Sequence, residues 1–144
     1  MNEIAEIING TLHSGIPVEI MEYSIDSRSV VTPEHTLFFA LTGNNHNGHD
    51  YIRTLYSDGM RAFVISEFRE EFNQLTGANF IVVENVLTAL QQLAAHHRQH
   101  TQAEVIGITG SNGKTVVKEW LYQLLVNDHA VYRSPRSYNS QVGV

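Results

Sequence analysis

The residues best suited to chemistry lie in the stretch VIGITGSNGKTVVKE, which covers positions 105–119. An apolar run there meets a turn containing Gly110 and Gly113, and Lys114 and Thr115 open a helical pattern. Glycines allow successive backbone N–H groups to point at one anion, and the following helix adds the positive end of its dipole. A lysine at this point meets terminal phosphates, and a threonine hydroxyl is placed to ligate Mg²⁺. The stretch therefore predicts a site for a nucleoside triphosphate.

The spacing of this turn departs from the usual phosphate-binding loop, which has a glycine five positions before Gly113. Ile108 occupies that position, and the nearest earlier glycine is Gly107. The alternative interpretation is a polar strand-to-helix turn with an exposed lysine. The position of the turn between an apolar strand and an amphipathic helix favours the phosphate site, because this is the arrangement in which such loops work.

The elements that must position this turn alternate between strand and helix, which predicts the α/β class with an at least partly parallel sheet. Helices are expected at 3–9, from Asp50 to a stop at Gly59, from a cap at Asn85 to about His100, and at 113–126. Strands are expected in 16–26, 36–41, 61–65, 79–84, 105–109 and 130–132. The helical spacing of Trp120, Leu121, Leu124 and Leu125 predicts core positions. Residues 66–78 give no clear prediction.

Two domains are expected, with the boundary near residues 100–103. Residues 1–102 would form a small α/β domain with a mixed sheet, and residues 103–144 the first βαβ unit of a P-loop ATP-binding domain. Roughly forty residues are too few for an independent nucleotide-binding domain. The second segment is therefore expected to be a truncated start, and this chain alone is expected not to turn over substrate.

The composition is that of an ordinary globular protein. Among the 144 residues, 15 Asp and Glu stand against 9 Lys and Arg, and this acidic balance disfavours broad nucleic-acid binding. The absence of cysteine excludes disulfides and thiolate sites. The N-terminus lacks the basic region of a signal peptide, and no apolar run approaches the roughly 20 residues of a membrane span. We therefore expect a cytoplasmic protein.

The sequence GITGSNGKT, followed by KE, resembles the ATP-binding turn of the Mur ligase family, whose members build the peptide stem of cell-wall precursors and have this shorter spacing. The resemblance implies ATP and Mg²⁺ as cofactors and a catalytic role for Lys114 and Thr115, with Thr115 on the metal. It also implies that ATP phosphorylates a terminal carboxylate, which an amine then attacks. The residues that would hold the nucleotide are Gly110, Ser111, Asn112, Gly113, Lys114, Thr115 and Asn139.

The N-terminal part is similar to the segments with which family members hold the UDP end of the precursor. These segments are DSRSV at 26–30, LFFAL at 37–41 and GNNHNGHDYI at 43–52. The resemblance implies that Ser27, Arg28, Thr42 and Gly43 contact the substrate. From the residues alone, Ser27 and Arg28 belong to a surface pair with Asp26 that shapes a turn, whereas Thr42 and Gly43 end a strand, the usual place for ligand contacts in an open α/β sheet.

The stretch YNSQVGV at the end of the sequence is similar to that of the branch that joins D-alanyl-D-alanine to UDP-N-acetylmuramoyl-tripeptide. Departures are Ser137, where the branch has a second asparagine, and Glu34, His35 and Thr36, where it has a glycine and an acid. SPRSYNSQ at 134–141 resembles members fused to an alanine racemase. The alternatives are the branch that adds the third amino acid, another amide ligase of the superfamily, and a non-catalytic module that binds UDP-sugars.

The histidines have ordinary explanations beside functional ones. His46 and His49 lie in the polar loop after the 36–41 strand, and we expect hydrogen bonding within that loop rather than metal binding. His96, His97 and His100 crowd the end of the helix that starts near Asn85, where imidazoles meet the last carbonyl groups. The metal-protease pattern H-E-x-x-H is absent from the sequence, so a solvated helix terminus is the better interpretation.

Overall fold

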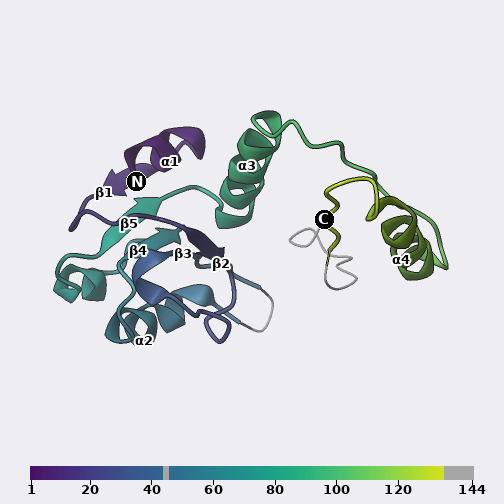
Figure 1. Cartoon of the computed structure of the whole chain (residues 1–144). Coiled ribbons are helices and arrows are strands. Elements are labelled where there is room, and N and C mark those ends of the chain that lie inside the picture. Colours follow the sequence, from purple (N-terminus) through teal and green to yellow (C-terminus); the bar gives the residue numbers. More distant parts are fainter. Residues whose placement is uncertain (44–45, 135–144) are drawn as a thin grey trace. The chain divides into compact units, whose positions relative to one another are not determined.

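The computed structural model describes residues 1–43 and 46–134 (Figure 1). The chain forms two compact units, Met1–His100 and a second that begins at Thr101. The functional division into domains 1–102 and 103–144 stays a prediction.

The first unit is built on a mixed five-stranded sheet with the order β1-β5-β4-β3-β2. Its strands are β1 (Thr11–His13), β2 (Glu22–Ser24), β3 (Thr36–Phe39), β4 (Ala62–Ile65) and β5 (Asn79–Val82). Neighbouring strands from β2 to β5 run parallel, and β1 pairs antiparallel with β5. The α/β class with a mixed sheet is confirmed. The sequence prediction missed β1, and only Glu22–Ser24 of the expected 16–26 strand is strand.

The helices are α1 (Asn2–Ile7), α2 (Ile52–Ser57), α3 (Val86–Gln99) and α4 (Lys114–Leu125), with short 3₁₀ helices at Pro33–His35, Gly48–Tyr51 and Glu70–Gln74. The cap predicted at Asn85 is confirmed, because its side chain accepts from the backbone N–H of Thr88. Gly59, at φ +108°, follows the end of α2 as predicted. The cap predicted at Asp50 is wrong: the side chain of Asn47 accepts from the N–H of His49, so the helical segment begins earlier.

The core of the first unit covers both faces of the sheet, because successive side chains of a strand point to opposite faces. On one face, Leu37, Phe39 and Val64 pack with residues of α1 and α3. On the other face, Phe38 and Phe63 pack with residues of α2 and of Glu70–Gln74. Figure 1 shows α1 and α3 on the side of the sheet opposite to α2. Strands buried on both faces explain the continuous apolar runs in the sequence.

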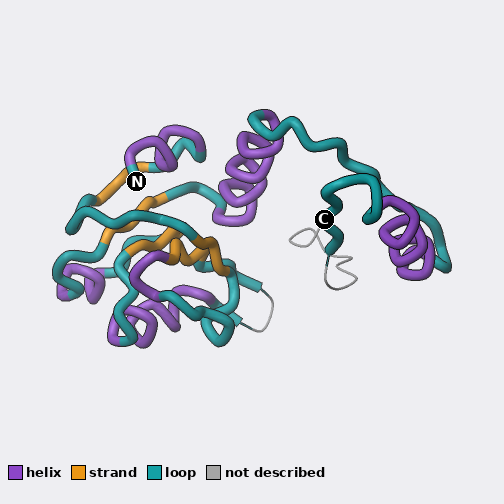
Figure 2. Tube along the Cα trace, in the orientation of Figure 1, coloured by secondary structure: helices purple, strands orange, loops and turns teal. Residues whose placement is uncertain are grey.

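In the second unit, α4 follows an extended segment that Figure 2 shows as loop. The strands expected at 105–109 and 130–132 are therefore not observed. A strand requires a neighbour that accepts and donates its backbone hydrogen bonds, and no described segment pairs with 105–109. The helix expected at 113–126 is confirmed as α4.

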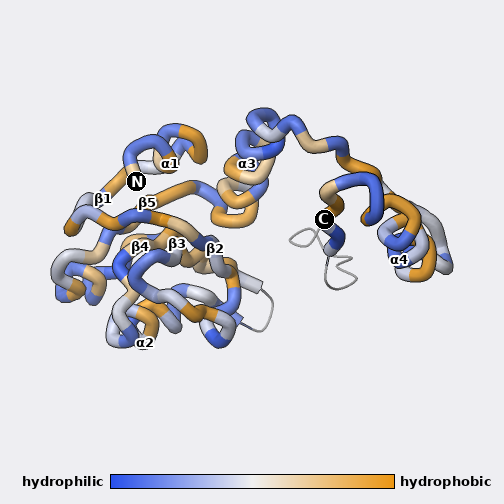
Figure 3. The backbone as a smooth tube through the Cα atoms, viewed as in Figure 1, coloured by the Kyte–Doolittle hydropathy of each residue, from blue (hydrophilic) through white to orange (hydrophobic). Residues whose placement is uncertain are grey.

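The core positions predicted on α4 are corrected in part. Trp120 and Leu124 are exposed by 63% and 71%, whereas Leu121 and Leu125 are half-buried. Figure 3 shows that α4 carries both hydrophobic and hydrophilic residues. The described part of this unit contains no buried residue, since it has no sheet against which the helix could bury its apolar face.

Candidate functional site

The glycine turn before α4 has the backbone geometry that its sequence predicts. Gly110 and Gly113 adopt positive φ angles of +144° and +77°, which other residues rarely adopt. Gly113 directly precedes the first residue of α4, and its carbonyl accepts from Val117. The backbone N–H groups of the first turn of α4 have no partner within the helix. They and the helix dipole make this end of α4 attractive to an anion.

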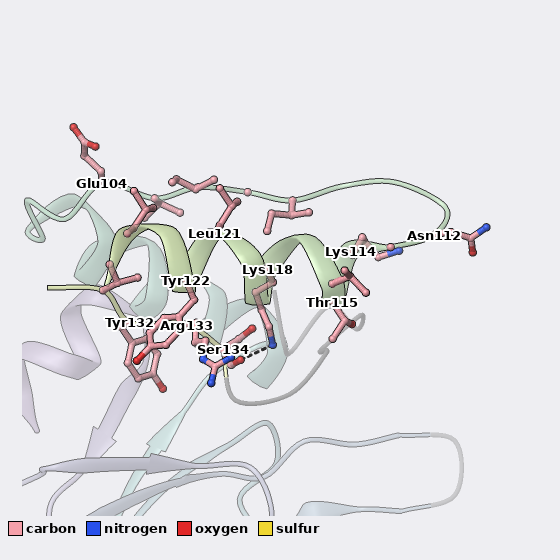
Figure 4. Close-up of a pocket in the computed structure, with 18 of the residues that line it drawn as sticks. Glu104, Asn112, Lys114, Thr115, Lys118, Leu121, Tyr122, Tyr132, Arg133 and Ser134 are labelled. Atoms are coloured by element: carbon pink, nitrogen blue, oxygen red, sulfur yellow. Dashed lines mark hydrogen bonds between the residues drawn. The ribbon is translucent and has the colours of Figure 1, made fainter. Parts of the chain in front are cut away.

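Lys114 and Thr115 lie at this end of α4, whereas Asn112 points outward at the tip of the turn (Figure 4). The Lys114 ammonium folds back over the turn and donates to the carbonyl of Gly110, at 2.5 Å. An ammonium has three donor hydrogens, so this bond holds the charge at the turn while leaving donors for a phosphate. The residues present therefore fit the phosphates of a nucleotide.

The same residues fit Mg²⁺ through the hydroxyl of Thr115. Mg²⁺ in nucleotide sites is held by one or two protein ligands, together with phosphate oxygens and water. Within the described residues no group of three or more His, Cys, Asp or Glu side chains is arranged for a metal. A cation at this turn would therefore depend on the nucleotide for most of its ligands.

A cavity of about 770 Å³ runs along α4 from this turn. It lies between the segment that begins at Glu104 and the segment that ends at Ser134. About one helical turn along α4 from Lys114, the Lys118 ammonium donates to the carbonyl of Ser134, at 2.8 Å (Figure 4). The Arg133 guanidinium, which pairs with Glu119, lies over the ring of Tyr122 at 4.2 Å. Polar groups thus gather at the turn and near Ser134, and the lining also includes apolar residues such as Leu121 and Val131.

The four predicted substrate contacts lie at one edge of the sheet in the first unit. Ser27 and Arg28 follow the end of β2, and Thr42 and Gly43 follow the end of β3. Because β2 and β3 are parallel, both loops leave the sheet at its carboxyl edge, where ligands bind in open α/β sheets. The structure thereby brings the four residues to a common edge.

Arg28 forms the surface pair that the residues alone suggest. Its Nε and one terminal nitrogen donate to the two carboxylate oxygens of Asp26, each at 2.9 Å. These hydrogen bonds lower the pKa of Asp26 to about 2. The Arg28 side chain is 87% exposed, and a guanidinium has five donor hydrogens. The pair therefore fixes the orientation of Arg28 and leaves donors for an anion from solvent.

Thr42 and Gly43 belong to a loop that folds back on itself. The Thr42 hydroxyl donates to the Asn47 side chain at 3.3 Å, and the Gly43 N–H donates to the His46 carbonyl at 2.8 Å. Gly48 approaches the end of β3 so closely that a Cβ there would lie 2.7 Å from backbone atoms of Ala40. The loop is thus held against the sheet edge.

His49 anchors this loop and is only 3% exposed. Its Nδ1–H donates to the Asn47 side chain at 2.8 Å, and its Nε2 accepts from the Ser66 N–H at 3.1 Å. The expected hydrogen bonding of His49 is confirmed. Burial is the main cause that lowers the pKa of His49 below its ordinary value, and the charge of Arg69 adds to it. Because Nε2 accepts a backbone hydrogen bond, the structure requires the neutral ring.

Sequence reasoning missed a small crevice at the same sheet edge, with a volume of about 170 Å³. Its lining residues are Leu41, Thr42, Ser66, Glu84, Asn85, Val86 and Leu87. Ser66 directly follows the buried strand β4, and Glu84 and Asn85 come shortly after β5. A polar residue at the end of a buried parallel strand was the available signal. The strand order needed to bring these residues to Thr42 could not be read from it.

Two further predictions concern a helix end and the end of the sequence. The ring of His100 donates from Nδ1 to the carbonyl of His96 at 2.8 Å, which confirms that an imidazole meets the last carbonyls of α3. The predicted nucleotide contact Asn139 lies outside the described residues, as do the whole of YNSQVGV and all of SPRSYNSQ except Ser134.

Comparison with known proteins bears on both units. Residues 19–98 match the family model described as Mur ligase family, catalytic domain. The chain belongs to the Mur ligase family. It is 30% identical over 144 residues to the UDP-N-acetylmuramoyl-tripeptide–D-alanyl-D-alanine ligase of Bacillus subtilis, covering all of this chain and 31% of that protein. It is 40% identical over 108 residues to the Rickettsia prowazekii ligase of the same name, covering 75% of this chain and 23% of that protein.

Solved Mur ligase structures are also similar to the chain. One is a crystal structure of MurF from Acinetobacter baumannii, with a TM-score of 0.84 and 27% identity over 99% of this chain and 30% of that one. Another is the MurF ligase of Thermotoga maritima in complex with ADP, with a TM-score of 0.70 and 29% identity over 85% of this chain and 27% of that one. The chain thus spans less than a third of the length of these Mur ligases. Within its described residues, no helix is long and apolar enough to cross a membrane.

Proposed function

We propose that this chain is the N-terminal portion of an ATP-dependent amide ligase of peptidoglycan precursor synthesis. The full-length enzyme would join D-alanyl-D-alanine to UDP-N-acetylmuramoyl-tripeptide. The observation that carries the proposal is the glycine turn, with its two positive φ angles and Lys114 folded over it, in a chain similar along its whole length to ligases of that name. The ADP bound in a similar structure supports a nucleotide at this turn.

The second unit would bind the nucleotide. ATP supplies the phosphoryl group that turns an unreactive carboxylate into an electrophile. The N–H groups of Gly113 and its neighbours and the Lys114 ammonium are placed to stabilise the negative charge that grows on the phosphoryl oxygens. The Thr115 hydroxyl would contribute one ligand to Mg²⁺. Gly110, Ser111 and Asn112 shape the turn, and Asn139 is proposed as a further contact on the basis of its sequence motif.

The first unit would hold the UDP end of the precursor at the carboxyl edge of its sheet. Arg28 presents a guanidinium oriented by Asp26, which suits the negative diphosphate. Ser27, Thr42 and Gly43 lie at the same edge and would complete the contacts. The cytoplasm is the proposed location, because ATP and UDP-linked precursors are nucleotides of that compartment.

The test is a titration of the purified 144-residue chain with UDP-N-acetylmuramoyl-tripeptide and a titration of the full-length enzyme with Mg·ATP, because roughly forty residues are too few for an independent nucleotide-binding domain. We expect Arg28→Ala to weaken precursor binding about tenfold, as expected for a lost charge-assisted hydrogen bond, and to leave nucleotide binding unchanged. Lys114→Met is expected to do the reverse. In the full-length enzyme, product analysis should show the dipeptide added in one step. Addition of a single amino acid, or precursor binding with no affinity for ATP, would contradict the proposal.

The alternatives give different results in these assays. The branch that adds the third amino acid, or another amide ligase of the superfamily, would bind ATP but form another product. A non-catalytic module would bind UDP-sugars and show no response to Lys114→Met. The similarity to ligases named for the addition of D-alanyl-D-alanine favours the proposed dipeptide-adding ligase over these alternatives.

A further inference from the structure

The crevice beside α3 is too small for a whole nucleotide. Sites that enclose a drug-sized ligand measure about 300–1,000 Å³, whereas this one measures about 170 Å³. It therefore suits one ring of a larger ligand whose remainder lies outside. Its lining combines the apolar residues Leu41, Val86 and Leu87 with polar ones, among them Thr42, Ser66 and Glu84.

The charge of the crevice selects the kind of group that fits it. No lysine or arginine is among its lining residues, and Glu84 is the one acidic residue among them. The amide oxygen of Asn85 is already occupied by the N–H of Thr88. A carboxylate accepts hydrogen bonds and repels phosphate, and its two oxygens match two adjacent hydroxyl groups. The crevice thus favours a neutral diol over an anion, although it lies at a helix N-terminus.

The position of the crevice relates it to Arg28. It extends from Glu84, after β5, to Thr42, after β3, and β2 is the next strand in the sheet. Neighbouring strands lie about 4.8 Å apart, so the loop that carries Arg28 leaves the sheet roughly one strand spacing beyond Thr42. A sugar ring in the crevice would therefore share the carboxyl edge of the sheet with the Arg28 guanidinium, which suits a phosphate attached to that ring. A nucleoside diphosphate joins a ribose diol to phosphates in this way.

From these observations we infer that Glu84 recognises the ribose of the uridine nucleotide by accepting hydrogen bonds from its 2′- and 3′-hydroxyl groups. Thr42 and Ser66 lie on the same crevice and orient the ring. This inference rests on the proposed function, because it assigns one part of the UDP moiety to a place at the sheet edge. It makes Glu84 a specificity-determining residue that acts on the sugar and not on the phosphates.

The experiment compares UDP with 2′-deoxy-UDP by calorimetric titration of the full chain. The unsubstituted chain should bind UDP about tenfold more tightly than the deoxy analogue, since a hydrogen bond to a charged group is lost. In Glu84→Gln the affinity for UDP should fall about tenfold and the ratio between the two ligands should approach one. The matched control is Glu6→Gln, which removes an exposed carboxylate from α1 and should leave both affinities unchanged.

The outcomes separate this inference from the proposed function. If neither nucleotide binds to the unsubstituted chain, the uridine site itself is wrong and the inference falls with it. If both bind equally well, or if Glu84→Gln retains the preference for UDP, only the ribose assignment is overturned. If Glu84→Gln binds both nucleotides more tightly, the crevice holds phosphate, which also overturns it. Circular dichroism of the variant shows whether the fold is intact.

Discussion

Replacing His49 by phenylalanine should loosen the loop that carries Thr42 and Gly43. The buried imidazole makes hydrogen bonds to Asn47 and Ser66, at 2.8 and 3.1 Å. A neutral hydrogen bond contributes about 1 kcal/mol to stability, and phenylalanine keeps the apolar packing while losing both bonds. We therefore expect His49→Phe to lower the free energy of unfolding by about 2 kcal/mol. For a unit of this size the melting temperature should fall by roughly 10 °C.

The same substitution should remove a dependence of stability on pH. The pKa of His49 is lowered in the folded chain from an ordinary value of 6.5, mainly by burial. Glu67 and Asp50 oppose this shift without reversing it. Between the folded pKa and 6.5 the unfolded chain binds more protons, so the contribution to stability is complete above pH 6.5 and is lost as the pH falls through the folded pKa. One group changes stability by at most about 1.4 kcal/mol per pH unit.

Urea unfolding followed by far-ultraviolet circular dichroism, at several pH values between 5 and 8, measures both effects. The difference in stability between the unsubstituted chain and His49→Phe should shrink as the pH falls below 6.5. His46→Phe is the matched control, because His46 is an exposed histidine of the same loop and should change neither quantity. A difference that stays constant over this range, or grows toward acid pH, would refute the argument that the neutral ring is required.

Three further predictions address other parts of the molecule. Gly113→Ala should destabilise the glycine turn by about 1 kcal/mol and weaken Mg·ATP binding, because the backbone φ angle at Gly113 is +77° although the space around it is open. Gly107 also lies in open space, so the control Gly107→Ala should bind Mg·ATP as the unsubstituted protein does. Equal affinities of the two variants for Mg·ATP would contradict the argument from backbone strain. Asn79→Leu should cost about 2–3 kcal/mol in urea unfolding, because the buried Asn79 amide gives up its hydrogen bonds to the Gly15 N–H and to the Ile16 and Arg61 carbonyls; an equally stable variant would contradict this. Asn85→Ala should cost about 1 kcal/mol through the lost cap of α3, and unchanged unfolding would exclude the cap as a stabilising contact.

The parts of the fold that the sequence predicts well are those in which a local pattern and the tertiary environment agree. The runs LFFA and AFVI are apolar throughout, and the structure buries both on two faces as β3 and β4. The α3 helix has a capping asparagine and an apolar stripe, and its buried residues include Val86 and Leu93. The helical spacing also places Ala94 beside Leu90 and Leu93, but Ala94 is exposed and Ala89 is buried instead.

The strand expected at 105–109 shows the limit of this agreement. Its side chains are as apolar as those of the strands that form, yet Val105 and Ile106 are exposed by 66% and 61%. The apolar pattern indicates which side chains a segment could bury. A strand forms only when a neighbouring strand accepts and donates its backbone hydrogen bonds. β1 shows the converse, because Thr11–His13 has a weak pattern and becomes strand through its pairing with β5.

The two candidate sites differ in the same way. The shape of the glycine turn depends on residues that are neighbours in the chain. Its positive φ angles and the helix that follows could therefore be predicted from a short stretch of sequence. The crevice at Glu84 joins residues that follow three different strands, and nothing in the sequence near Glu84 distinguishes it from other exposed acids. Only the order β5-β4-β3 makes it a neighbour of Thr42. Since parallel strands always release their loops at one edge, the chemistry at that edge follows from the strand order together with the residue types. A substitution that moved β5 in the sheet would therefore separate Glu84 from the proposed UDP contacts without changing any of those residues.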